Sequence, residues 1–121
     1  MSHYFAFKLG PKEYLGEFIV GELKGGNWNQ PWRSEVTMFA EQAVRAAITL
    51  IQSENTLSSI LTKGIALGGD VDTVGAIALG CASQSEEILD NLPKWMLTDL
   101  ENGPFGTDYI TALDRDLRLR F

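Results

Sequence analysis

The sequence predicts an all-α fold. Apolar residues recur at helical spacing along most of the chain, and clusters of glycine and proline separate these segments. In addition, residues 73–82 are almost all small and apolar, which indicates a buried helix that neighbouring backbones approach closely. The 121 residues, of which 45% are hydrophobic, suit one core. We therefore expect one compact helical domain that covers residues 1–121.

The first 33 residues are expected to form an N-terminal arm and loop. Residues 3–9 alternate loosely and are rich in aromatic side chains, which indicates a short strand or an extended arm. Residues 12–23 carry apolar side chains at roughly helical spacing, although two glycines weaken that helix. A loop with two glycines and a proline follows, up to Arg33.

Three helices are predicted next. Ser34 is a suitable N-cap for the first, whose apolar stripe starts at Val36 and continues to about Glu54. The second covers about residues 57–66 and ends at two consecutive glycines. The third is the small-residue segment 73–82, which we expect to be the central helix of the domain.

The last part of the chain is predicted to contain two short helices and a longer one. Ser85 is a suitable cap for a short helix over residues 86–92, and Trp95 lies in another. The final helix is amphipathic, and its apolar side is formed by Tyr109, Ile110, Leu113 and Leu117.

Charge and composition exclude several classes of function. The formal net charge is -6 and the pI is about 4.6, which argues against nucleic-acid binding and against anionic membrane surfaces, since both need a basic footprint. No apolar stretch is long enough to span a membrane. The single cysteine, Cys81, rules out an internal disulfide and fits a reducing compartment. We expect a cytoplasmic protein.

The segment "LGGDVDTVGAIALG" carries the strongest chemical signal. Asp70, Asp72 and Thr73 precede the small-residue helix, and Gly68 and Gly69 permit a tight turn or the close approach of a ligand. Either aspartate alone is explained by helix capping. Two neighbouring carboxylates, however, repel each other unless a cation, a proton or hydrogen bonds offset the charge. Carboxylate and hydroxyl oxygens suit Mg²⁺, Mn²⁺ or Ca²⁺. The residues alone leave capping and metal binding open.

A family resemblance adds to this interpretation. The stretch "LGGDVDTVGAIALGCAS" resembles the C-terminal signature of the ADP-ribosylglycohydrolase family, in which a G-G-D-x-D-T segment precedes a helix of small residues. The resemblance extends from about Ser34 to Leu117. It includes the helix pair before the motif and the segments "DNLPKWMLTDLENG" and "GTDYITALDRDL" after it.

The resemblance implies a fold and a chemistry. The family is all-α and has a metal site, usually dinuclear, for Mg²⁺ or Mn²⁺. Carried over to this chain, the metal ligands are Asp70, Asp72 and Thr73. The implied reaction is hydrolysis of the glycosidic bond between ADP-ribose and a modified protein side chain, with a metal-activated water as the nucleophile.

The chain also departs from the family pattern. Family members are longer, and their N-terminal half supplies a second acidic cluster with a threonine followed by two aspartates. This sequence contains no Asp-Asp pair, so it resembles the C-terminal half of the family fold with half of the metal site. No catalytic residue is assigned, and the isolated chain is expected to be inactive. We expect a homodimer or a separate partner that provides the N-terminal half. The alternative function is a non-catalytic helical interaction module derived from the family.

Two tryptophans are further candidates for ligand contact. Trp28 and Trp32 lie in a loop of glycine, asparagine and proline, where their rings could stack on a nucleobase. The alternative is that they anchor this loop to the core, since large aromatic side chains mostly serve packing.

Overall fold

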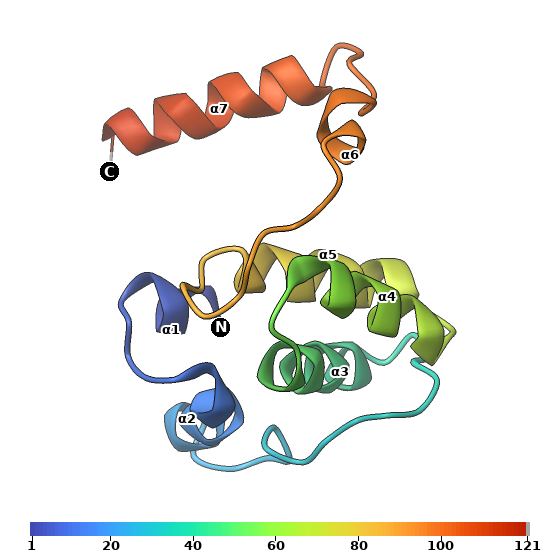
Figure 1. Ribbon diagram of the computed structural model, residues 1–121. Coiled ribbons are helices and arrows are strands. Elements are labelled where there is room, and N and C mark those ends of the chain that lie inside the picture. The colour runs from blue at the N-terminus through green and yellow to red at the C-terminus, as the bar shows by residue number, and fades with distance from the viewer. Residues whose placement is uncertain (121) are drawn as a thin grey trace. The chain divides into compact units, whose positions relative to one another are not determined.

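A computed structural model describes residues 1–120, and helices dominate it (Figure 1). In these residues the only β-pairing consists of two isolated bridges, Val36 with Gly69 and Thr56 with Leu89. The predicted all-α class is confirmed. The helices are α1 (Ser2–Ala6), the 3₁₀ helix η1 (Lys12–Tyr14), α2 (Leu15–Glu22), α3 (Ala40–Ser53), α4 (Leu57–Leu67), α5 (Val71–Ala82), α6 (Trp95–Thr98) and α7 (Thr107–Arg120).

The chain forms two compact units, Met1–Asn91 and the residues from Leu92 onward. The core of the first unit lies among α3, α4 and α5, which pack against one another (Figure 1). Its largest fully buried side chains are Leu15, Val36, Ile48, Ile51, Ile60 and Val74. The predicted single domain stays a prediction.

Helix α3 is the most strongly amphipathic element of this core. Alanine and branched apolar residues alternate with polar ones at helical spacing, so a single stripe is buried: Ala43, Ala46, Ala47, Ile48, Leu50 and Ile51. The alanines in this stripe let α5 approach closely. Helix α4 begins at an N-cap, because the Thr56 hydroxyl accepts a hydrogen bond from the Ser59 amide at 3.1 Å.

The end of α3 is held by a buried lysine. The Lys12 ammonium group donates to the main-chain carbonyls of Ile51, Gln52 and Glu54 at 3.3, 3.0 and 2.7 Å. These carbonyls lie where a helix leaves acceptors without intrahelical donors, and the helix dipole favours a cation there. Lys12 therefore fastens the N-terminal segment to the core.

The expectation of an N-terminal strand or extended arm was wrong. Residues 2–6 form α1, and the neighbouring side chains Tyr4 and Phe5 are both buried. A strand would point these two rings to opposite faces. In a helix they lie on the same side, where the Tyr4 ring contacts Phe18 of α2 with centroids 4.9 Å apart.

The predicted helix start at Ser34 was also wrong. Helix α3 begins at Ala40, and the preceding residues are extended. Val36 is fully buried in this extended segment and pairs with Gly69. The apolar side chain that we assigned to a helical stripe therefore belongs to a backbone bridge, and this bridge positions the candidate site described below.

Helix α5 is buried on one face rather than all round. Val74, Ala78, Cys81 and Ala82 face the core. A side chain placed at Gly75 or Gly80 would meet nothing within 4 Å. The predicted central position of α5 is confirmed by its packing on both α3 and α4, but its small residues also form an uncovered surface.

The second unit contains α6, a turn and α7. The turn is closed by hydrogen bonds from the Thr107 amide to Glu101 and from the Asp108 amide to the Asn102 side chain. The predicted amphipathic helix is present, but none of its side chains is buried. The predicted short helix at residues 86–92 is absent, and Ile88 is instead buried within a turn. Within residues 1–120, no helix has the length and apolar character needed to cross a membrane.

Candidate functional site

The turn before α5 is fixed to a distant segment by its backbone. The Val36 amide donates to the Gly68 carbonyl at 3.2 Å, and the Asp70 amide donates to the Val36 carbonyl at 2.8 Å. Gly68 and Gly69 have φ angles of 79° and 77°, a region that favours glycine. A Cβ atom at Gly69 would lie 1.9 Å from the Val36 carbonyl oxygen. The glycine pair is therefore required for the backbone approach that places Asp70.

The two aspartates occupy the first turn of α5. Asp70 is the N-cap residue, yet its side chain makes no capping hydrogen bond. Asp72 is exposed and lies two residues after Asp70. The Asp70 carboxyl group therefore does not cap α5, and helix capping does not explain this residue.

The carboxyl groups of Asp70 and Asp72 interact. A hydrogen bond with Asp70, followed by the backbone amides of Thr73 and Asp72, holds the pKa of the Asp72 carboxyl below its usual range. The Asp70 and Asp72 carboxyl groups are therefore near neighbours at the start of α5. Thr73 is exposed beside them. The structure thus brings together Asp70 and Asp72, two of the three predicted metal ligands. The third, Thr73, is a neighbour in the same turn.

This donor set fits one hydrated divalent cation. Carboxylate and hydroxyl oxygens are the hard ligands that Mg²⁺ and Mn²⁺ favour, and Mg²⁺ commonly keeps several waters. Within residues 1–120, no group of three or more histidine, cysteine, aspartate or glutamate side chains is placed to hold a metal. The set does not fit a dinuclear site, because three oxygens from one turn leave most positions of two cations to water.

Trp32 is bonded to α3 and to its own loop, whereas the contact of the Trp28 ring lies within its own loop. The Trp32 amide donates to the Thr49 hydroxyl at 2.9 Å, and the Trp32 indole N–H donates to the Ser34 carbonyl at 3.0 Å. The Arg45 guanidinium lies over the Trp32 ring, 5.2 Å from its centroid. The Trp28 ring lies against Gly26. This geometry favours the anchoring role, although Trp32 also lines a pocket.

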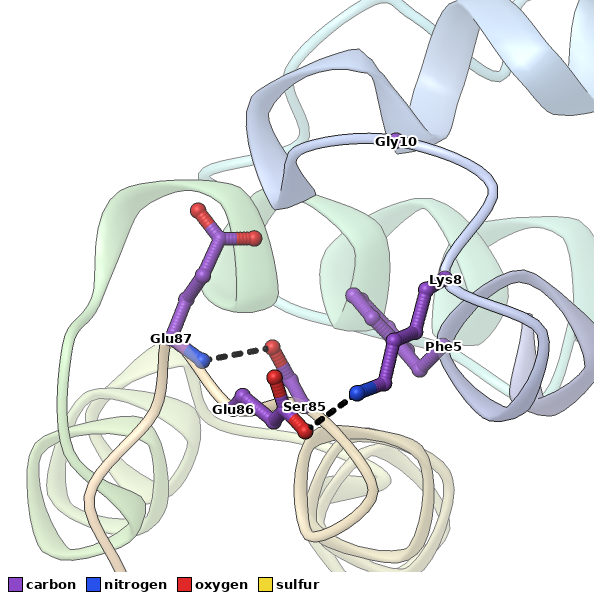
Figure 2. Close-up of a pocket in the computed structure, with 6 residues that line it drawn as sticks. All are labelled: Phe5, Lys8, Gly10, Ser85, Glu86 and Glu87. Atoms are coloured by element: carbon purple, nitrogen blue, oxygen red, sulfur yellow. Dashed lines mark hydrogen bonds and ion pairs between the residues drawn. The ribbon is translucent and has the colours of Figure 1, made fainter.

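Two pockets of the first unit stand out, and neither of them includes the aspartates. Figure 2 shows the smaller pocket, which has a volume of about 120 Å³. In this pocket, Lys8 and Glu86 form an ion pair of 2.6 Å beside Phe5, and the Glu87 amide donates to the Ser85 hydroxyl at 3.2 Å. The larger, of about 320 Å³, lies where Trp32, α3 and α4 meet. Sequence analysis missed it because its residues come from three separate segments, none of which carries a motif.

Glu54 forms one wall of the larger pocket and is nearly fully buried. Its carboxylate accepts hydrogen bonds from Lys63 at 2.6 Å and from Ser53 at 3.1 Å. Burial alone would raise the pKa of Glu54. The hydrogen bonds from Lys63, Ser53 and Ser59, together with the charge of Lys63, outweigh burial and lower this pKa.

We expect Glu54 to make the stability of the fold depend on acid pH. Because its pKa is lower in the folded state, the unfolded chain binds the proton first, so this contribution is complete above the unfolded pKa of about 4.3 and is lost as pH falls through the folded pKa. In Glu54→Gln, the free energy of unfolding measured by urea titration should fall less steeply over this range. The exposed Glu22→Gln is the matched control and should follow the unmodified protein. Equal slopes for all three proteins would contradict the assignment.

Comparison of the chain with protein-family models, with curated proteins and with solved structures finds no match. The resemblance to the ADP-ribosylglycohydrolase family therefore rests on the motif and its flanking segments, and it stays a prediction.

Proposed function

We propose that this chain is an ADP-ribosylglycohydrolase-like protein that binds one Mg²⁺ or Mn²⁺ ion through Asp70, Asp72 and Thr73. The observation that carries the proposal is the position of Asp70 and Asp72 at the start of α5, on a glycine turn that is bonded to Val36. An uncapped aspartate beside a charged one is an arrangement that a cation stabilises. The substrate class, ADP-ribose on a modified side chain, follows from the family resemblance.

In this proposal the residues of the chain hold the metal ion, and the metal ion activates a water molecule. The turn fixes the Asp70 backbone and so places Asp70 and Asp72 together, where their carboxylates would contact a cation. A bound Mg²⁺ or Mn²⁺ would acidify a water for attack on the glycosidic bond. The second acidic cluster would come from a separate N-terminal half or from another copy of the chain, so the isolated chain is expected to be inactive. We also propose a cytoplasmic location, since Cys81 is a free buried thiol.

A specific observation favours the second candidate, a non-catalytic interaction module. Within the second unit taken by itself, as far as Arg120, no side chain on the apolar side of α7 is buried, Tyr109 and Ile110 included. Soluble proteins usually cover such surfaces with another element or partner. This observation does not involve the aspartates, so metal binding separates the two candidates.

The test is a thermal shift with Mn²⁺. A ligand that binds only the folded state stabilises it, by about 2.7 kcal/mol at a free concentration 100 times its Kd. We expect Mn²⁺ to raise the Tm of the unmodified chain and to have no effect on the Asp70→Asn/Asp72→Asn double variant, which keeps the side-chain shape and removes the charge.

The matched control is Asp116→Asn, an exposed aspartate in α7 that should leave the Mn²⁺ response intact. If the double variant still responds in full, the ligand assignment is wrong. If the unmodified chain shows no response to Mn²⁺ or Mg²⁺, the interaction module becomes the better interpretation.

A further inference from the structure

The larger pocket of the first unit has the size and lining of a small-molecule site. Its volume of about 320 Å³ lies at the lower end of the range of about 300–1,000 Å³ that is typical of such sites. Trp32, Leu50 and Leu67 supply its apolar surface, and polar side chains from α3, α4 and the Trp32 loop supply the rest. It lies wholly within residues 1–91.

The acceptor groups of this pocket already take part in hydrogen bonds within the chain. The Thr49 hydroxyl accepts from the Trp32 amide and donates to the Arg45 carbonyl. The Ser53 hydroxyl donates to Glu54, and the Glu54 carboxylate also accepts from Lys63. A cationic ligand would therefore compete with Lys63 for the Glu54 carboxylate.

The donor groups, in contrast, are largely available. Arg33 is exposed, lines the pocket and forms no ion pair or hydrogen bond with another residue of the chain up to Arg120. A guanidinium group carries five N–H donors and no acceptor. Lys63 donates only to Glu54 within the same residues, and its side chain is 62% exposed, so two of its ammonium protons remain. With Glu54 neutralised by Lys63, Arg33 leaves the pocket with a net positive charge.

We propose that this pocket binds a small organic anion whose charged head contacts Arg33 and Lys63 and whose flat apolar body lies against Trp32 and Leu67. Either a carboxylate or a phosphate head group can accept hydrogen bonds from these donors, since both present pairs of oxygen atoms to a guanidinium group. A purely inorganic anion is not expected to be the best ligand, because it would make no contact with the apolar side chains of Trp32, Leu50 and Leu67.

This inference is independent of the metal site. The pocket shares no residue with the acidic turn, and its charge is opposite to that of Asp70 and Asp72. The experiment is therefore done without divalent metal, and the Asp70→Asn/Asp72→Asn variant should bind the anion as the unmodified chain does. A failure of the metal proposal leaves this result unchanged.

The experiment follows the indole N–H resonances of the ¹⁵N-labelled full chain during titration with phenyl phosphate and, separately, with benzoate. The Trp32 indole N–H, which donates to Ser34, should shift with either anion, whereas that of Trp95 should not. Phenol supplies the same ring without charge, and benzylamine supplies it with a positive charge. We expect phenol to bind at least about tenfold more weakly than the preferred anion, the effect of losing one charge-assisted hydrogen bond. Benzylamine should not bind.

Variants then test the residue assigned to the charge. Arg33→Gln, at an exposed position, should raise the Kd of the preferred anion about tenfold, and Arg33→Lys should restore part of the affinity. Lys24→Asn removes the same charge from an exposed position outside the pocket and should leave Kd unchanged.

The preference between phenyl phosphate and benzoate identifies the head group, and either preference supports the proposal. The proposal is overturned if phenol binds as tightly as both anions, if Arg33→Gln leaves the Kd unchanged, or if the Trp32 resonance does not move at millimolar concentrations of either anion.

Discussion

Gly69→Ala is expected to lower the free energy of unfolding by about 3 kcal/mol or more. An alanine in this left-handed conformation costs about 1–2 kcal/mol by itself. Its Cβ would also lie 1.9 Å from the Val36 carbonyl oxygen, so the bridge must open and its two backbone hydrogen bonds, worth about 1 kcal/mol each, are lost. Thermal unfolding should show a fall in Tm on the order of 15 °C, since about 4–8 °C correspond to each kcal/mol in a domain of this size.

Two other glycines provide matched controls for this effect. Gly68→Ala also carries the strain of a positive φ, 79°, but has only the Glu35 side chain nearby, at 3.8 Å, so it should cost less than Gly69→Ala. Gly80→Ala, in the exposed part of α5 with nothing within 4 Å, should stabilise by up to about 1 kcal/mol through helix propensity. Equal stabilities for the Gly68 and Gly69 variants would show that the contact with Val36 does not matter.

Lys12→Met is expected to destabilise the fold by about 3 kcal/mol. The substitution keeps an unbranched apolar stem. It removes the ammonium group of a residue that is only 9% accessible, and this group donates to three carbonyl groups. Hydrogen bonds from charged donors contribute about 1.5–3 kcal/mol each, but the bonds of one group are not additive. The end of α3 would keep three acceptors without donors. Urea unfolding followed by circular dichroism measures the loss.

Lys8→Met is the matched control for this substitution. It breaks an ion pair with Glu86 in which both side chains are more than two-thirds exposed, and such pairs contribute under about 1 kcal/mol. A Lys12→Met protein no less stable than Lys8→Met would mean that water replaces the buried ammonium group without cost.

The helices of the core could be predicted because each has a local pattern. Alanine, leucine and isoleucine recur at helical spacing in α3 and α4, and consecutive glycines mark the end of α4. The N-terminal helix could not be predicted in this way. Tyr4 and Phe5 are poor evidence for a helix as local residues, and only burial against Phe18 decides their conformation.

The candidate site was predictable in part for the same reason. The positions of Asp70 and Asp72 at the start of a helix follow from the residues on either side of them. The role of Val36 does not, because the glycines indicate a close approach but nothing in the sequence shows that Val36 is the segment that approaches. The role of Lys12 was equally hidden, since lysine is seldom buried and the pattern around it indicates only a weak helix.

The bridge between Val36 and Gly69 links the position of the aspartates to the folding of the helices between these two residues. It closes a loop that contains all of α3 and α4, so the acidic turn cannot form locally in the unfolded chain. The binding proposed at Asp70 and Asp72 would therefore be coupled to the folding of two helices that supply neither carboxylate. A substitution between α3 and α4 would weaken metal binding without touching the site, in proportion to the fraction of molecules in which the loop is open.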